Sequence, residues 1–317
     1  MVLLQLSQSH LTLIEQCPRK FQYIYLDQLT TPIPPEQREH LNRGSLVHHL
    51  MQQHELQLSH PLLSDPGHHF FPPSTLIPRT IQDSQAQLYY MAEALVAAVP
   101  MMNESTVFRQ SEYRLNLPWS GVLLTVIYDL LLMDVDKAHI FDWKTYLSPP
   151  NLQSLRQRLA QHWQTKLYPF VLVETSNYSP DAVELSYWFV KRTHGDQALH
   201  LDRHERVQTR QMFEPECLTF PYSDRLHQQT KQELTQVIEQ VQHWINHYSV
   251  GQPLPKVDAS EGLCGQCPFQ TRCDRTEDPK KQDNWDGLED IAALPEIQPF
   301  PIQIKNPGDS ESSGFEN

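Results

Sequence analysis

The residues Asp142, Trp143 and Lys144 form an acid-x-lysine triplet in a short segment rich in β-branched and aliphatic residues. Side chains alternate between the two faces of a β-strand, so a strand over residues 138–145 directs Asp142 and Lys144 to the same face. A carboxylate beside an ammonium group could hold a metal ion and act on the water that attacks a phosphodiester. The alternative is an ordinary surface ion pair, because such triplets are common.

A second acid, Asp129, lies in the segment that precedes this strand. If the two segments form a hairpin about Asp134–Lys137 so that Met133 pairs with Ala138, Asp129 faces Asp142 and their Cβ atoms lie about 4.5–5.5 Å apart. Two facing carboxylates inside an apolar sheet repel one another unless a cation lies between them. The pattern therefore predicts a Mg²⁺ or Mn²⁺ site, unless both acids lie at strand ends in solvent.

Strands and helices with recognisable patterns are expected to position these residues. A helix that begins near Glu36 places Gly44, Val47, His48 and Met51 on one face, because their spacing is i, i+3, i+4 and i+7. The following pattern predicts three antiparallel strands, a helix and a further strand, which is an α/β fold. Their expected ranges are Val107–Leu117, Val122–Met133, Ala138–Thr145, Leu152–Thr175 and Val183–Lys191.

The remaining segments have less uniform patterns. A short helix is expected to end at Cys17, with Ser7 or Ser9 as its N-cap. Residues 60–78 contain too many prolines for a regular element and favour a loop, whereas residues 193–220 are weakly patterned and could be a hairpin or an insertion. Further helices are expected over residues 82–99 and 234–248.

The composition is that of a soluble globular protein. The chain has 317 residues, of which 39% are hydrophobic and 20% charged, and these values exclude fibrous, membrane and wholly disordered classes. No uncharged apolar stretch reaches the roughly 18 residues of a membrane span, and the first residues lack the basic segment of a secretory signal. We therefore expect a cytoplasmic protein without a membrane partner.

The net charge of −13 argues at first against a polyanionic partner. However, residues 274–317 carry 11 acidic and 4 basic side chains, which leaves 27 acidic and 21 basic side chains in residues 1–273. In addition, a divalent cation bound by some of these acids would give that site a different electrostatic field from the one that the net charge implies. We expect residues 1–273 to form one domain and residues 274–317 to form an acidic, largely disordered tail.

Four of the five cysteines form a pattern typical of a metal centre. Cys264, Cys267 and Cys273 have the spacing Cys-x2-Cys-x5-Cys, and Cys17 lies near the other end of the chain. Four thiolates could hold either a structural zinc ion or an iron-sulfur cluster, and the residues alone leave both open. Cys217 lies outside the pattern and is expected to be a plain thiol.

Three further residues have alternative interpretations. His48 on an apolar helix face could be a metal ligand, although a buried histidine with satisfied ring nitrogens is more common. Gln164 and Tyr168 are i, i+4 neighbours and share a helix face, so they could contact a nucleic-acid backbone or support Lys144. The alternative is that the helix simply packs Tyr168 on the sheet.

Together these motifs resemble the PD-(D/E)XK nuclease superfamily, which has a restriction-endonuclease-like core. Arg43–His48 resembles the Gly-x3-His motif of its RecB-like branch, and Gln164–Tyr168 resembles the Gln-x3-Tyr motif of that branch. The resemblance implies that Asp129, Asp142 and Lys144 are catalytic. It also implies a metal site formed by the side chains of His48, Asp129 and Asp142 and the main-chain carbonyl of Trp143.

The cysteine pattern resembles the [4Fe–4S] staple of the AddB nuclease domain and of the CRISPR-associated exonucleases in that branch. The resemblance implies that Cys17, Cys264, Cys267 and Cys273 bind a cluster that joins both ends of the domain. Such a ring would close a long loop and stabilise the fold.

The resemblance implies a metal-dependent deoxyribonuclease, with single-strand or end-directed exonuclease activity in DNA repair, recombination or CRISPR-type processing. The sequence contains no Gly-x4-Gly-Lys-Ser/Thr phosphate loop, so a helicase or another repair or CRISPR partner would supply any motor. One departure from the family is Val126-Ile127 before Tyr128-Asp129, where glycine and often arginine are usual. It supports the alternative of a catalytically inactive DNA-binding or scaffold protein with the same fold.

Overall fold

The computed structural model describes residues 4–29, 31, 35–59, 88, 91–99, 106–147, 151–192, 213–265 and 267–275. The chain forms two compact units. Unit 1 comprises Met1–Pro32, Asn116–Val126 and Gln229–Asn317, and unit 2 comprises Ile33–Leu115 and Ile127–Gln228. The two long strands β2 and β3 each contribute residues to both units.

Unit 2 has the predicted α/β order of helix, three strands, helix and strand. The strand β3 pairs with β2 and antiparallel with β4, β4 pairs parallel with β5, and β5 pairs antiparallel with β6. Residues 193–220 were weakly patterned in the sequence. Strand β6 covers residues 213–220 of this segment, and residues 193–212 lie outside the described residues. The elements are α3 (Pro35–Ser59), β2 (Thr106–Trp119), β3 (Val122–Asp134), β4 (Ala138–Leu147), α5 (Leu152–Gln161), α6 (Trp163–Glu174), η3 (Pro180–Ala182), β5 (Val183–Arg192) and β6 (Phe213–Pro221).

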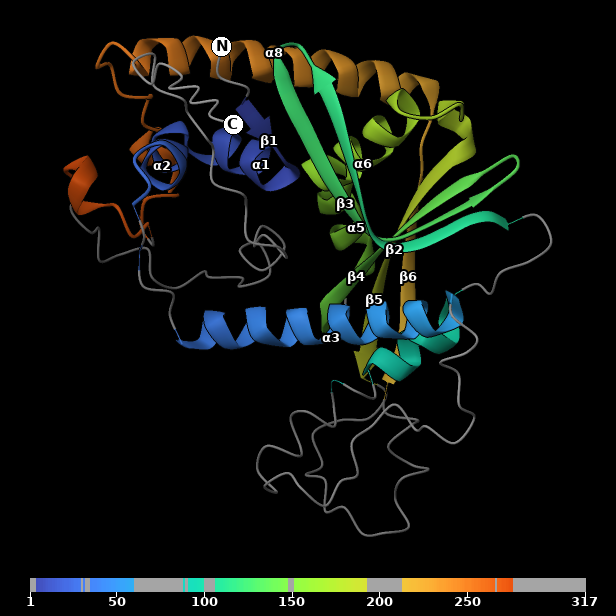
Figure 1. The fold of residues 1–317 in the computed structure, drawn as a ribbon. Helices are drawn as coiled ribbons and strands as arrows, with labels where there is room; N and C mark the ends of the chain where they lie inside the picture. The colour runs from blue at the N-terminus through green and yellow to red at the C-terminus, as the bar shows by residue number, and fades with distance from the viewer. Residues whose placement is uncertain are drawn as a thin grey trace, which may run out of the picture. The chain divides into compact units, whose positions relative to one another are not determined.

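The long helix α3 packs against β4, as Figure 1 shows. The apolar face predicted for this helix is buried, because Val47 and Met51 join a core cluster with Phe141 and Trp143 of β4. Residues 91–98 are helical, as predicted, and contribute buried side chains to the same cluster. Burial of this apolar area gives α3 a fixed position on the sheet. The loop predicted over residues 60–78 lies outside the described residues.

The single helix predicted over residues 152–175 is wrong at one point. His162 has an extended backbone, with φ −66° and ψ 142°, and separates α5 from α6. The carbonyl of Leu159 accepts a 3.1 Å hydrogen bond from the His162 N–H at the end of α5, and the hydroxyl of Thr165 adds a 2.5 Å hydrogen bond to the same carbonyl. These local bonds compensate for an interruption that the helical periodicity does not reveal.

Unit 1 contains the two ends of the described chain. A short helix begins after Ser7 and ends before Cys17, as predicted. Strand β1 was not predicted; it pairs parallel with residues 122–124 at the start of β3. The elements are β1 (Leu4–Leu6), α1 (Gln8–Gln16), α2 (Pro18–Phe21), the π-helical turn η1 (Gln22–Leu26), most of α8 (Asp224–Tyr248), η5 (Ala259–Glu261) and η6 (Thr271–Cys273). The amphipathic helix predicted over residues 234–248 is confirmed as part of α8, which begins ten residues earlier, at Asp224.

A two-residue turn joins β2 to β3 within unit 1. Its central residues, Ser120 and Gly121, have φ values of 46° and 79°, the left-handed conformations of a tight hairpin. The side chains of Thr125 and Asn116 are joined by a 2.8 Å hydrogen bond across the hairpin. In an antiparallel hairpin the numbers of opposite residues have a constant sum. The sum of 116 and 125 is 241, as expected when Trp119 pairs with Val122.

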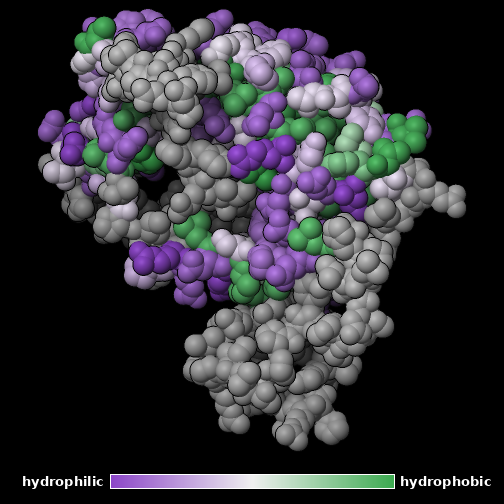
Figure 2. Space-filling model, in the orientation of Figure 1, coloured by the Kyte–Doolittle hydropathy of each residue, from purple (hydrophilic) through white to green (hydrophobic). Residues whose placement is uncertain are grey.

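The described residues that are visible in Figure 2 are mainly hydrophilic, and hydrophobic residues lie among them in separate groups. None of the described helices is both long and apolar enough to span a membrane.

Candidate active site

Helix α3 passes very close to β4 at Gly44. An ideal Cβ at this position would lie 3.3 Å from Thr145 Oγ1, closer than most side chains approach one another. Glycine therefore permits the close approach of helix and strand. About one turn later, His48 reaches the main chain of β4, where its Nε2 lies 3.2 Å from the Trp143 carbonyl oxygen.

His48 also faces two carboxylates. Its Nδ1 lies 3.4 Å from Asp129 Oδ1 on β3 and 3.8 Å from Glu112 Oε1 on β2. One ligand atom from each of these three residues lies within 4.8 Å of the other two. Among the described residues, no other group of three or more His, Cys, Asp or Glu side chains meets this condition.

The spacing of this group suits a small octahedral cation. Ligand atoms about 2.1 Å from one ion lie about 3.0 Å apart in adjacent positions and about 4.2 Å apart in opposite positions. The distances from His48 Nδ1 to the two carboxylates fall between these values. The side chains of His48 and Glu112 are 13% and 24% exposed, so the group is open to solvent. The donor set, two carboxylates and an imidazole, therefore fits a small divalent cation.

The predicted register of the β3–β4 hairpin is confirmed, because residues 130–133 pair with residues 138–141. At the next position a side chain replaces the main-chain pairing. Asp129 Oδ2 accepts a 2.7 Å hydrogen bond from the Trp143 N–H, while its Oδ1 faces His48. Asp129 is 5% exposed, so this bond satisfies a buried main-chain donor and fixes the carboxylate.

Asp142 directs its carboxylate to other partners. Its Oδ2 lies 2.7 Å from Lys144 Nζ, and its Oδ1 accepts a hydrogen bond from Gln164 Nε2. Gln164 Oε1 in turn accepts a 2.9 Å hydrogen bond from Lys144 Nζ. At most 5% of each of these residues is exposed. Asp142 is thus outside the group around His48, and the structure places the two predicted acids in adjacent but separate clusters.

Lys144 lies on the same face of β4 as Asp142, as strand alternation requires. Its Nζ also lies 4.9 Å from the centre of the Tyr187 ring. An unpaired buried ammonium would be very costly, and here a carboxylate, an amide oxygen and an aromatic face all stabilise it. These contacts hold the Lys144 ammonium group in one position, whereas an exposed lysine side chain would not be held in this way.

The two residues of the predicted Gln-x3-Tyr motif lie on α6 but have different surroundings. Gln164 joins Asp142 and Lys144, so it supports the lysine. Tyr168 packs edge to face with Tyr128, the residue before Asp129, with ring centres 5.3 Å apart. The Tyr128 hydroxyl donates a 2.9 Å hydrogen bond to the Tyr168 carbonyl, and burial raises the pKa of Tyr128. Tyr168 therefore fixes the end of β3 that carries Asp129.

A positive region adjoins the buried lysine at the junction of α5 and α6. Burial, together with the charges of Lys144, Arg158 and Lys166, lowers the pKa of His162 to about 4. His162 is therefore neutral near pH 7. Desolvation is the main cause, and three cations act on the same ring.

Glu112 is the site residue that the sequence reasoning missed. Its φ of 50° is left-handed, although it lies within a strand. The sequence did contain a signal, because the β2–β3 register in which Trp119 pairs with Val122 also places Glu112 opposite Asp129. The turn at Ser120 and Gly121 specifies that register.

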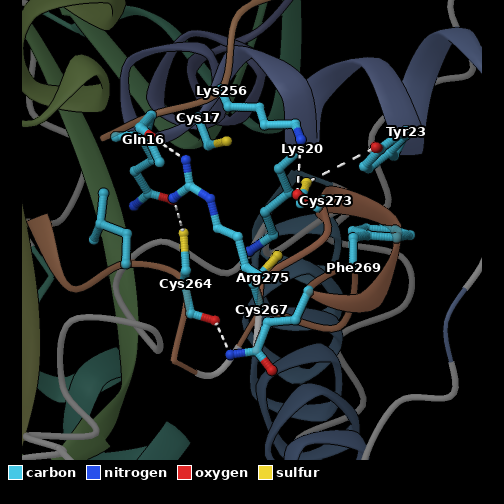
Figure 3. Close-up of a pocket in the computed structure, with 13 residues that line it drawn as sticks. Gln16, Cys17, Lys20, Tyr23, Lys256, Cys264, Cys267, Phe269, Cys273 and Arg275 are labelled. Carbon is cyan, nitrogen blue, oxygen red and sulfur yellow. Dashed lines mark hydrogen bonds between the residues drawn. The ribbon is translucent and has the colours of Figure 1, made fainter. Parts of the chain in front are cut away.

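The four cysteines of the predicted cluster line one cavity of about 150 Å³ in unit 1 (Figure 3). Basic groups surround it. Arg275 Nη1 lies 2.7 Å from Cys264 Sγ, and Lys256 Nζ donates a 2.7 Å hydrogen bond to the Cys273 carbonyl. Burial raises the pKa of Cys267. Cys217 lies in unit 2, outside the pattern as expected.

The cysteine sulfurs do not converge on one point. A tetrahedral zinc ion with sulfurs at about 2.3 Å requires sulfur–sulfur distances of about 3.8 Å. No three of the cysteines described here have sulfurs within 4.8 Å of one another. The sulfurs as placed therefore do not form a closed single-ion site, and they do not by themselves support an iron-sulfur cluster.

Two comparisons with known proteins bear on this site. The family model of the PD-(D/E)XK nuclease superfamily matches residues 5–274, which include every residue of both clusters. A search of curated proteins finds no match.

Proposed function

The chain belongs to the PD-(D/E)XK nuclease superfamily, and we propose that it hydrolyses DNA phosphodiester bonds with bound Mg²⁺ or Mn²⁺. One observation carries the proposal: Trp143 joins the two polar clusters. Its carbonyl and N–H contact His48 and Asp129, while the residues on either side of it are Asp142 and Lys144. The possible metal ligands and the buried ammonium group of Lys144 therefore meet at three consecutive residues of β4.

We assign the side chains of His48, Asp129 and Asp142 to the metal site. The Trp143 carbonyl, predicted as a further ligand, lies instead at the other ring nitrogen of His48, where it fixes the ring so that Nδ1 faces the carboxylates. When bound, the cation would neutralise charge on the phosphoryl group and lower the pKa of the attacking water. Asp142 can contribute without losing its present partners, because two carboxylate oxygens offer about four lone-pair positions. Lys144 and Gln164 use part of this capacity.

Lys144 would orient the attacking water and stabilise the negative charge that develops on the phosphoryl oxygens. In the reaction, the attacking water loses a proton to solvent as its oxygen forms a bond to phosphorus, the bond from phosphorus to the leaving nucleotide oxygen breaks, and that oxygen takes a proton from solvent. Lys144 Nζ is 2.7 Å from the Asp142 carboxylate, which favours the charged ammonium form. This pairing supports charge stabilisation as the main role of the lysine.

We propose single-stranded DNA or free DNA ends as the substrate and assign the chain to the RecB-like branch of the superfamily. The support is the Gly44–His48 and Gln164–Tyr168 motifs, both of which lie at or beside the site. A nuclease of this kind would act in DNA repair, recombination or CRISPR-type processing. A helicase or another partner in such a pathway would supply unwound strands.

An iron-sulfur cluster bound by the four cysteines remains part of the proposal. Its support is the shared cavity and the basic groups that line it, which would offset the negative charge of thiolate ligands. Anaerobically purified protein should contain iron and absorb visible light, and Cys273→Ala should lose both. Cys217→Ala is the matched control and should retain the cluster. A colourless preparation with stoichiometric zinc would refute the cluster.

The activity itself is tested with end-labelled single-stranded and duplex DNA, with Mg²⁺, Mn²⁺ or a chelator. Cleavage that requires the metal and prefers single strands or ends is expected. Labelled RNA in the same assay tests the choice of DNA. The rival is a DNA-binding protein that has kept the fold and lost the chemistry, which Val126-Ile127 before Tyr128-Asp129 favours. DNA binding without cleavage under every condition would establish that rival.

A further inference from the structure

Glu112 has a backbone conformation that is unusual for its residue type. Its φ is 50°, in the left-handed region that residues other than glycine rarely adopt, and it lies inside strand β2. Bulges next to active sites commonly redirect a side chain. Such a conformation persists only where the surroundings maintain it, so the residue at this position calls for a physical reason.

The side chain of Glu112 is directed toward an environment that should repel it. Glu112 and Asp129 have carboxylate oxygens within 4.8 Å of one another, and like charges this close are unfavourable. The separation of 3.8 Å from His48 Nδ1 exceeds a hydrogen bond, so this histidine compensates only in part. An exposed glutamate would avoid both costs by turning into solvent, yet only 24% of this side chain is exposed.

We propose that Glu112 is a direct ligand of the divalent cation, together with His48 and Asp129. The inference deepens the proposed function and depends on it, because the cation is the one that the nuclease site would bind. A cation between the two carboxylates converts their repulsion into attraction, and Mg²⁺ and Mn²⁺ both accept carboxylate ligands. The left-handed backbone at Glu112 serves to bring its side chain, which is longer than that of aspartate, to the ion.

Manganese affinity tests the inference without recourse to cleavage. Isothermal titration of chelator-treated protein with Mn²⁺ should show at least about a tenfold loss of affinity in Glu112→Gln, since even supporting residues of metal sites contribute 10- to 100-fold. Glu184→Gln is the matched control. Glu184 also lies on a strand and pairs with a histidine, His139, at 3.1 Å, but it belongs to no ligand group among the described residues. This control should bind Mn²⁺ as the wild type does.

A second variant separates a ligand from a structural residue. Glycine adopts the left-handed conformation without strain, but it also raises the conformational entropy of the unfolded chain, so the two effects on stability oppose one another. Glu112→Gly should therefore keep a melting temperature close to that of the wild type in the metal-free protein while it binds Mn²⁺ more weakly. Wild-type Mn²⁺ affinity in Glu112→Gly would overturn the inference.

The outcomes also separate this inference from the proposed function. If Asp129→Asn loses Mn²⁺ affinity and Glu112→Gln retains it, Glu112 is no ligand and the metal site of the proposed function stands. If the wild type binds no Mn²⁺, the proposed function itself fails, and this inference fails with it.

Discussion

Replacement of Lys144 by methionine is the perturbation whose effects the structure predicts most directly. Methionine keeps much of the length and volume of the side chain but removes the charge. The Asp142 carboxylate would then remain buried, with 0% of the residue exposed, beside a thioether instead of an ammonium group. Two independent losses should follow, one in folding stability and one in the rate of cleavage.

The loss of stability is expected to be large. At the 2.7 Å separation of Lys144 Nζ and Asp142 Oδ2, an effective dielectric constant of about 20 gives an attraction of about 6 kcal/mol. Desolvation offsets much of that attraction while the pair is intact, but removal of one partner leaves a buried charge and typically costs about 3–5 kcal/mol. For a chain of 317 residues that corresponds to a fall in melting temperature of about 4–8 °C. Asp142→Asn in the same chain should restore most of it.

The assays are thermal unfolding of metal-free protein and single-turnover cleavage with saturating enzyme, which isolates the chemical step. Cleavage by Lys144→Met should be at least about a hundredfold slower, the low end for a group that acts on the attacking water. Lys137→Met is the control, since Lys137 is exposed in the turn between β3 and β4 and should change neither quantity. Equal cleavage rates in the wild type and Lys144→Met would refute the role of the lysine. Equal melting temperatures would refute its burial in an ion pair.

Three further predictions concern the surrounding residues. Asp129→Asn and Asp142→Asn should each lower Mn²⁺ affinity in isothermal titration, and unchanged affinity in both would show that the acids share no cation. Gln164→Ala should slow cleavage and lower Mn²⁺ affinity, because Gln164 holds both Asp142 and Lys144 in place; normal cleavage together with normal Mn²⁺ affinity would remove Gln164 from the site. The pKa of His162 is lowered to about 4, so the unfolded chain binds its proton first, and this group reduces stability as the pH falls from about 6.5 toward 4. His162→Gln should flatten the stability curve in that window, and an unchanged curve would contradict the burial of the ring.

Periodic patterns in the sequence determined several parts of this site, because they report geometry within single elements. Helical spacing predicted that Gly44 and His48 share a face of one helix, and both do lie against β4. Strand alternation predicted that Asp142 and Lys144 lie side by side, and the turn between β3 and β4 set a hairpin register that the structure confirms. These relations depend on repeat distances of the backbone and need no knowledge of the other elements.

Only the tertiary structure decided which side chains from different elements meet. Asp142 lies with Lys144 and Gln164, and Asp129 lies with His48 and Glu112, although the hairpin alone would have paired the two acids. Packing of α6 on one face of β4 and of α3 on the other makes this choice, because each helix brings its own partner to within hydrogen-bond distance. The left-handed backbone of Glu112 is likewise a tertiary result, since no local pattern in β2 predicts a non-glycine residue in that conformation.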